Sequence, residues 1–317
     1  MVDFSIFGDY QNPVEFNFST AEGFSSQLRW TSQRINIFYA RTPRVESIAA
    51  REFRGFFATV FAQNMQVCSA DAEALSEALT AAADIVDYLT EQARLENERR
   101  QKVRDFAAQH DDFSDHVRDF FTGVDVPPNL TPAEPPPPQL LRLPLTRQRQ
   151  QDRSIRGSSG GISAADPKDL ISAAQVLGEA AAQVPSGSVL AGWFDDFTSQ
   201  CKYGTVEVGD LFVQLDRWRG LNDGDVEWLH AVAKAFQAAG SGVITLPNSA
   251  LRAALRAAGT PLWRTDLDIT SPGLSGIDPR TGYLEDPSNS APGNFIAPET
   301  ALAVAAAYSP HAHSRMD

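Results

Sequence analysis

Several residues whose side chains could carry chemistry lie together near position 110. Within the stretch HDDFSDHVRD, imidazoles and carboxylates crowd at His110, Asp111, Asp112, Asp115 and His116. Such side chains bind divalent metals or act as general bases. The two histidines are six positions apart, which places them on different faces of a helix, and no second cluster supplies further ligands. The sequence therefore favours a solvated acidic helix end over a metal site.

Other catalytic patterns in the sequence are incomplete. A second pair of imidazoles, His311 and His313, stands near the end of the chain without further ligands around it. The glycine-rich stretch at 157–161 lacks the lysine and the preceding strand that a phosphate-binding loop requires. Cys68 and Cys201 are too few for a disulfide framework or a thiolate metal site. We predict that the protein is not an enzyme and uses no cofactor or metal. The alternative is a metal-dependent hydrolase that uses the imidazoles near position 110.

The charge of the chain restricts its partners. Among 317 residues, 40 acidic side chains outnumber 27 basic ones, for a net charge of −13. Such a surface repels nucleic acids and anionic membranes, so we expect protein or cationic partners. The N-terminal stretch MVDFSIFGDYQNPVEF has no basic region and no apolar run of signal-peptide length, and the longest apolar tract, ALAVAAAY, is too short to span a bilayer. We expect no membrane insertion and no cleavable signal peptide.

The elements that would position these residues are mainly α-helical. The spacing of Ser19 and Glu22 is that of a capping box and predicts a helix start at Ser19. We expect this helix to end near Arg41, because Thr42-Pro43 interrupts the pattern. Its apolar stripe, at alternating steps of four and three, comprises Phe24, Leu28, Thr31, Ile35 and Phe38.

A second, longer helix is predicted over 45–108, with one internal glycine, Gly55. Its stripe has the heptad spacing of a coiled-coil seam, so we expect an antiparallel helical hairpin. The charged segment at 91–105 leaves little apolar surface, and we expect it to project into solvent or to meet another chain. The seam residues of this helix are Leu75, Leu79, Ala82, Val86, Leu89 and Ala93.

A composition change separates two helical modules. The segment at 126–161 is rich in proline, then in arginine and glycine, as in a linker. Its five arginines could bind a partner, but a solubilising role is the simpler interpretation. We therefore predict a hairpin domain at 1–125, a linker at 126–161, a second helical module at 162–259 and an irregular tail at 260–317.

The second module should contain four helices. The first begins with Asp166 as N-cap, Pro167 at the first position and Asp169 in the first turn. Three more are expected, two of them short, within 206–220, 225–240 and 246–259, with Gly240 and Gly259 closing the last two. The buried face of the first helix is predicted to be Leu170, Ala173, Ala174, Leu177 and Ala181.

One stretch of the hairpin resembles a known class of proteins. In REFRGFFATVF, the aromatic residues suit a helical core, but a glycine among them costs about 1 kcal/mol in a helix and indicates a bend or a close backbone approach. A helix, an aromatic-x-glycine turn and a heptad helix resemble the WXG and LXG hairpins exported by type VII secretion systems. Phe53-Arg54-Gly55 would form the bend, with phenylalanine in place of tryptophan.

The Tyr-x-x-x-Asp/Glu signal of that class is incomplete in this chain. Tyr88 is followed at that spacing by Gln92. Tyr203 and Glu207 have the spacing, but they stand beside Gly204, where a helix is not expected.

The C-terminal tail carries a second resemblance. The stretch GYLEDPSNSAPGNFIAPETALAV is similar to the segment that leads into the β-shell of RHS-repeat polymorphic toxins. Pro292 departs from that pattern, and AAAYSPHAHSR resembles the start of a repeat. The residues that match the pattern are Asp286, Pro287, Asn289, Gly293, Asn294 and Phe295.

Together the resemblances imply a non-enzymatic N-terminal trafficking module of a bacterial, type VII-secreted RHS-type toxin, made in the cytoplasm and exported. The implied partner is a small helical-hairpin secretion protein or chaperone, the chain's own second module, or a second copy in a homodimer. The alternative is a cytoplasmic helical adaptor. The residues expected to bind the partner are Phe24, Leu28, Ile35, Phe53, Arg54, Gly55, Leu75, Leu79, Val86 and Leu89.

Overall fold

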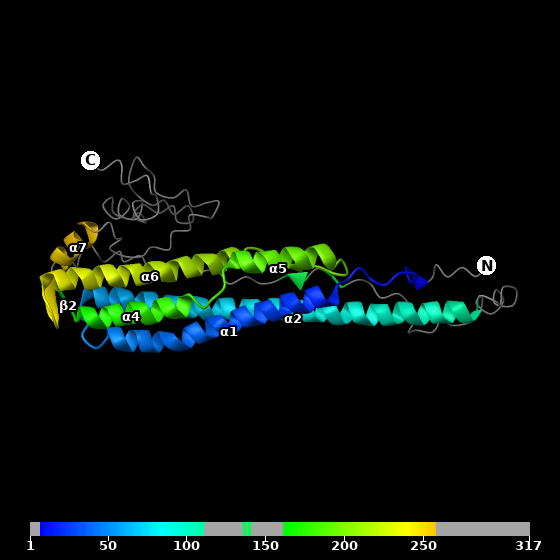
Figure 1. Ribbon diagram of the computed structural model, residues 1–317, viewed down its shortest axis with the longest axis horizontal. Helices are drawn as coiled ribbons and strands as arrows, with labels where there is room; N and C mark the ends of the chain where they lie inside the picture. The colour runs from blue at the N-terminus through cyan, green and yellow to red at the C-terminus, as the bar shows by residue number, and fades with distance from the viewer. Residues whose placement is uncertain (1–6, 111–135, 138, 141–160, 258–317) are drawn as a thin grey trace, which may run out of the picture. The chain divides into compact units, whose positions relative to one another are not determined.

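The computed structural model describes residues 7–110, 136–137, 139–140 and 161–257 (Figure 1). The described part is mainly α, as the sequence predicts, with two short two-stranded sheets. None of its helices is long and apolar enough to cross a membrane. The elements in chain order are α1 (Phe18–Ala49), α2 (Phe56–His110), β1 (Gln139–Leu140), β2 (Ile162–Ala165), α4 (Pro167–Ala181), α5 (Gly187–Gln200), β3 (Val206–Glu207), α6 (Leu211–Ala239), β4 (Ile244–Pro247) and α7 (Asn248–Ala257).

The chain divides into two compact units, and each unit combines residues from both predicted helical modules. Unit 1 contains 1–33, 75–143 and 185–215, and unit 2 contains 34–74, 144–184 and 216–317. The helices α1, α2 and α6 therefore contribute residues to both units.

The helices α1 and α2 pack together in antiparallel fashion. In unit 1, the Ser32 hydroxyl lies 2.8 Å from the Ser76 hydroxyl, and Ser25 bonds the Asp87 carboxylate further along α2. In unit 2, the Thr42 hydroxyl lies 3.0 Å from that of Ser69. Positions that rise along α1 thus meet positions that fall along α2, which is the register of a hairpin.

The start of α1 differs from the predicted capping box. The helix begins at Phe18, and the side-chain oxygen of Asn17 accepts a hydrogen bond of 3.2 Å from the amide of Thr20. The Asn17 amide also donates to Gln200 of α5 at 2.7 Å, which holds it in place. Glu22 lies 4.0 Å from Arg94. Asparagine is among the best N-cap residues, so it replaces Ser19 in this role.

The predicted break at Thr42-Pro43 is wrong, because α1 continues to Ala49 with Pro43 inside it. Proline has no amide hydrogen for the carbonyl four residues earlier, which is that of Tyr39. The hydroxyl of Thr42 donates to this carbonyl at 2.8 Å. The side chain thus supplies the hydrogen bond that proline cannot make, which removes one cost of keeping Pro43 in the helix.

In the second half of the chain, α4 agrees with its prediction. The Asp166 side chain accepts from the amide of Lys168 at 2.9 Å, Pro167 occupies the first turn, and the five predicted apolar residues are buried. The two helices predicted over 206–220 and 225–240 are instead one helix, α6, which runs through Gly220 and Gly224. A continuous buried face that includes Trp218, Leu221 and Trp228 outweighs the low helix propensity of glycine.

The short strands connect distant parts of the sequence. β1 pairs with β3 in parallel, and β2 pairs with β4 in antiparallel, with Ser163 opposite Leu246. Neither pairing was predicted, because such short strands lack a periodic pattern.

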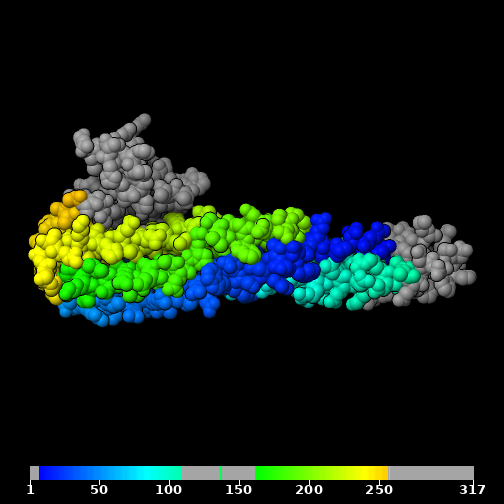
Figure 2. Space-filling model, in the orientation of Figure 1, coloured from blue at the N-terminus to red at the C-terminus, as the bar shows by residue number. Residues whose placement is uncertain are grey.

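The N-terminal segment lies along the charged end of α2, which was expected to be bare or to meet another chain (Figure 2). Phe7 and Val103 are buried against each other, and the Phe7 ring meets that of Phe106 edge to face at 6.2 Å. The arginines of this end donate to backbone carbonyls of the segment: Arg100 to Asn12 at 2.8 Å and Arg104 to Tyr10 at 2.6 Å.

Candidate functional site

The Phe53-Arg54-Gly55 stretch connects α1 to α2. Gly55 adopts φ +89°, a conformation that L side chains rarely accept. A Cβ atom at this position would lie 2.3 Å from the carbonyl oxygen of Ile162 and 2.9 Å from the Ser163 hydroxyl. The connection therefore needs glycine for its backbone angle and for the close approach of β2.

Arg54 closes the end of α1. Its backbone forms a bridge with Ala164 of β2, through hydrogen bonds of 2.8 and 3.1 Å. Its guanidinium donates to the carbonyls of Ala50 at 2.6 Å and Arg51 at 2.9 Å. A cation at a helix C-terminus is favourable because the last carbonyls carry partial negative charge.

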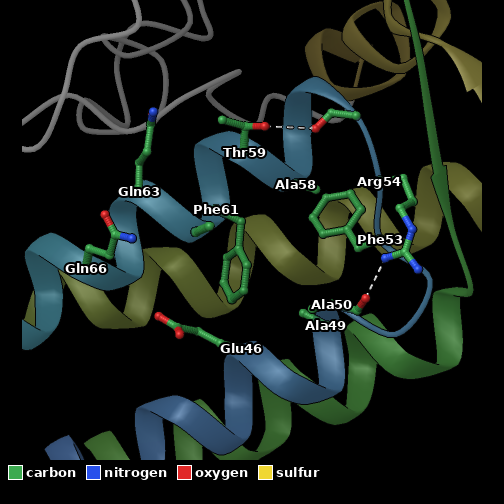
Figure 3. A pocket seen from close by; sticks show the side chains of 12 residues that line it. Glu46, Ala49, Ala50, Phe53, Arg54, Ala58, Thr59, Phe61, Gln63 and Gln66 are labelled. Carbon is green, nitrogen blue, oxygen red and sulfur yellow. Dashed lines mark hydrogen bonds between the residues drawn. The ribbon is translucent and has the colours of Figure 1, made fainter.

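A groove opens on one side of this connection, between the last turns of α1 and the first turns of α2 (Figure 3). Its volume is ≈ 630 Å³. Phe53 and Phe61 contribute its apolar part, with ring centroids 6.5 Å apart. The other lining residues are small or polar: Glu46, Ala49, Ala50, Arg54, Gly55, Ala58, Thr59, Ala62, Gln63 and Gln66.

Some polar groups of the groove have hydrogen-bond partners and others have none among the described residues. Arg54 uses its guanidinium on backbone carbonyls, and the Thr59 hydroxyl donates to the carbonyl of Gly55. Within the described part of the chain, no hydrogen bond or ion pair joins the Glu46 carboxylate to another residue, and burial raises its pKa. The Glu46 carboxylate can therefore accept hydrogen bonds from a bound cation.

The predicted seam residues are buried inside the chain. In unit 1, the Phe24 ring lies 5.5 Å from that of Phe197 and 5.9 Å from that of Phe194, both on α5. In unit 2, Phe38 meets Trp218 of α6 edge to face at 4.8 Å. The predicted partner-binding residues that are less than 5% exposed are Phe24, Leu28, Ile35, Phe53, Leu75, Leu79, Val86 and Leu89.

The other residues singled out in the sequence form no site in the described part of the chain or lie outside it. Among the described residues, no group of three or more His, Cys, Asp and Glu side chains could hold a metal ion. Three predicted groups lie outside the described residues: the acidic cluster after His110, the His311-Ala-His313 pair and the six matching residues of the RHS-like segment. Tyr203 stands in the loop that joins α5 to α6, with Gly204 at φ +89°, and Glu207 belongs to β3.

A buried ion pair on α2 was not predicted from the sequence. Arg99 donates to Glu96 through two nitrogens at 2.8 and 2.7 Å, and their side chains are only 9% and 6% exposed. Arg100 also bonds Glu96 at 2.8 Å. The three- and four-residue spacing was visible in the sequence, but the contact with the N-terminal segment, where Arg99 donates to the carbonyl of Phe7 at 3.0 Å, was not. Glu46 was missed too, because nothing in its local sequence distinguishes it from other surface carboxylates.

The chain matches no protein-family model, and no curated protein or solved structure is significantly similar to it.

Proposed function

We propose that the protein is a non-enzymatic trafficking module of a type VII-secreted RHS-type toxin. The observation that carries the proposal is the place of Phe53-Arg54-Gly55 between two long antiparallel helices, with Gly55 at positive φ. An aromatic-x-glycine stretch at that place is the feature that the exported hairpins share. The RHS-like segment at 283–304 supports the identity of the cargo by resemblance only.

In this proposal the chain supplies its own hairpin partner. The seam of a lone hairpin would expose apolar side chains, and a partner would have to cover them. Here Phe194 and Phe197 of α5 cover Phe24, and Trp218 of α6 covers Phe38. The export machinery would then receive a self-contained helical bundle, and a separate small hairpin partner would not be required for folding.

Secretion by cells tests the function directly. We expect the tagged chain to reach the culture medium of an actinobacterium with an active type VII system and to remain inside cells that lack the secretion ATPase. A cytoplasmic protein measured in the same medium controls for lysis. Retention in both strains, with the protein folded, would contradict export and favour the cytoplasmic helical adaptor.

A further inference from the structure

We propose that the groove beside Phe53-Arg54-Gly55 binds a basic, amphipathic segment of a protein partner. In this complex a lysine or arginine of the segment reaches the Glu46 carboxylate, and a neighbouring apolar side chain lies against Phe53 and Phe61. The inference concerns binding by the folded protein and does not rest on the proposed export function.

The size of the groove suits a few side chains. Its ≈ 630 Å³ falls within the range of ligand-binding clefts, about 300–1,000 Å³. The space exists because Ala50, Ala58 and Ala62 line it with single methyl groups. In Figure 3, Glu46 and Gln66 lie toward one end of the groove, Phe53 and Arg54 toward the other, and Phe61 between them.

The unpaired carboxylate of Glu46 favours a cation. The Arg54 guanidinium, which also lines the groove, donates to the carbonyls of Ala50 and Arg51, and among the described residues it forms no ion pair with the half-buried Glu46 carboxylate. A carboxylate that is partly withdrawn from water is stabilised when a cation with hydrogen-bond donors replaces the lost water. The net charge of −13 over the whole chain also attracts a basic partner and repels an acidic one.

The remaining polar groups favour a peptide over a small amine. Gln63 and Gln66 lie three positions apart on α2, and neither side-chain amide forms a hydrogen bond with another described residue. Each amide offers both donors and an acceptor, which suits the alternating N–H and C=O groups of a peptide backbone. A small organic cation would use the carboxylate and leave these amides to water.

Fluorescence anisotropy on the purified full chain tests the proposal with a labelled peptide of alternating leucine and lysine. We expect Glu46→Gln to weaken binding at least about tenfold, because a charge-assisted hydrogen bond is lost. The matched control is Glu52→Gln, which removes the same charge from an exposed residue that does not line the groove, and its affinity should equal that of the wild type. Ala62→Trp should block binding by filling the groove.

Three results would overturn the inference. Equal affinities of Glu46→Gln and Glu52→Gln would show that binding reflects only the net charge of the protein. Equal binding of a peptide with glutamate in place of lysine would exclude selection for a cation. Full competition by n-butylamine at a concentration equal to that of the peptide would reassign the groove to a small organic cation. Melting curves establish whether each variant is folded. If the Ala62→Trp variant does not fold, the Glu46→Gln variant alone decides the outcome.

Discussion

At the scale of single residues, two features of the structure each require glycine at position 55. The backbone has φ +89°, and the space that a Cβ atom would fill is occupied by the carbonyl of Ile162. Neither feature is present at Gly220, which lies inside a helix: its φ is not positive, and nothing lies within 4 Å of the position that a Cβ atom would take. The same residue type therefore has opposite effects on stability at the two positions.

We expect Gly55→Ala to destabilise the protein by about 2 kcal/mol or more, from the strained angle and the steric conflict together. Gly220→Ala should stabilise it by about 0.5–1 kcal/mol, because alanine has a better helix propensity and a smaller unfolded-state entropy. Urea unfolding of the two variants measures both changes. Similar effects at the two positions would contradict this account of Gly55.

The second residue-scale prediction concerns Glu96. Burial by itself would raise the pKa of Glu96, but hydrogen bonds from Arg99 and Arg100 outweigh it, and the pKa lies below 4.5. A carboxyl with a lowered pKa stabilises the folded state above its unfolded pKa, and this contribution is lost as the pH falls through the folded value.

We therefore expect Glu96→Gln to cost about 3 kcal/mol at pH 7, because it leaves Arg99 buried without its counter-charge. The cost should shrink as the pH falls below the ordinary pKa of glutamate, because the unfolded chain then binds a proton that folded Glu96, with its lowered pKa, does not. The cost should be lost once the pH has fallen through the folded pKa. Glu98→Gln, at an exposed neighbouring position, is the control. Unfolding measured from pH 7 to pH 3 checks the prediction, and a cost that does not depend on pH would argue against it.

At the scale of elements, a side-chain hydrogen bond helps α1 to continue past Pro43. Its end was predicted at Thr42-Pro43 because proline usually ends a helix. In the structure the Thr42 hydroxyl donates to the Tyr39 carbonyl, which Pro43 leaves without an amide donor. The residues after Arg41 extend α1 to Ala49, so that the connection spans 50–55 and ends with Gly55.

A double-mutant cycle tests whether the Thr42 hydroxyl replaces the amide donor that Pro43 lacks. Thr42→Val should destabilise the protein by about 1–2 kcal/mol, because the carbonyl of Tyr39 loses its donor and Ser69 its partner. In the Pro43→Ala background, the restored amide can serve Tyr39, so Thr42→Val should cost less. Equal costs in the two backgrounds would show that the hydroxyl does not compensate for proline.

At the scale of the whole molecule, the seam of the hairpin is completed by residues that follow the linker. Phe197 and Trp218 lie more than a hundred residues after the side chains that they cover, and Trp228 stacks on Phe57 at 6.3 Å. Each compact unit draws on both halves of the chain for this reason.

We therefore expect the two parts of the chain to assemble when the linker between them is left out. Polypeptides 1–125 and 161–317, expressed together, should co-purify through size-exclusion chromatography, whereas 1–125 alone should self-associate, because its buried aromatic residues lose their cover. Replacing Trp218 by alanine should weaken the association of the two pieces. A monomeric, stably folded 1–125 would contradict this view of the seam.

The mainly α class, the start and buried face of α4, and a bend or close backbone approach at Gly55 could be predicted from the sequence alone. These features depend on capping, helical periodicity and backbone angles, which act over a few residues. The structure decided what covers the seam, what lies along the charged end of α2, and that α6 passes through two glycines. Those outcomes depend on contacts between residues far apart in the chain, such as Phe24 with Phe197 and Arg104 with Tyr10, and no local pattern encodes which distant partner a surface will meet.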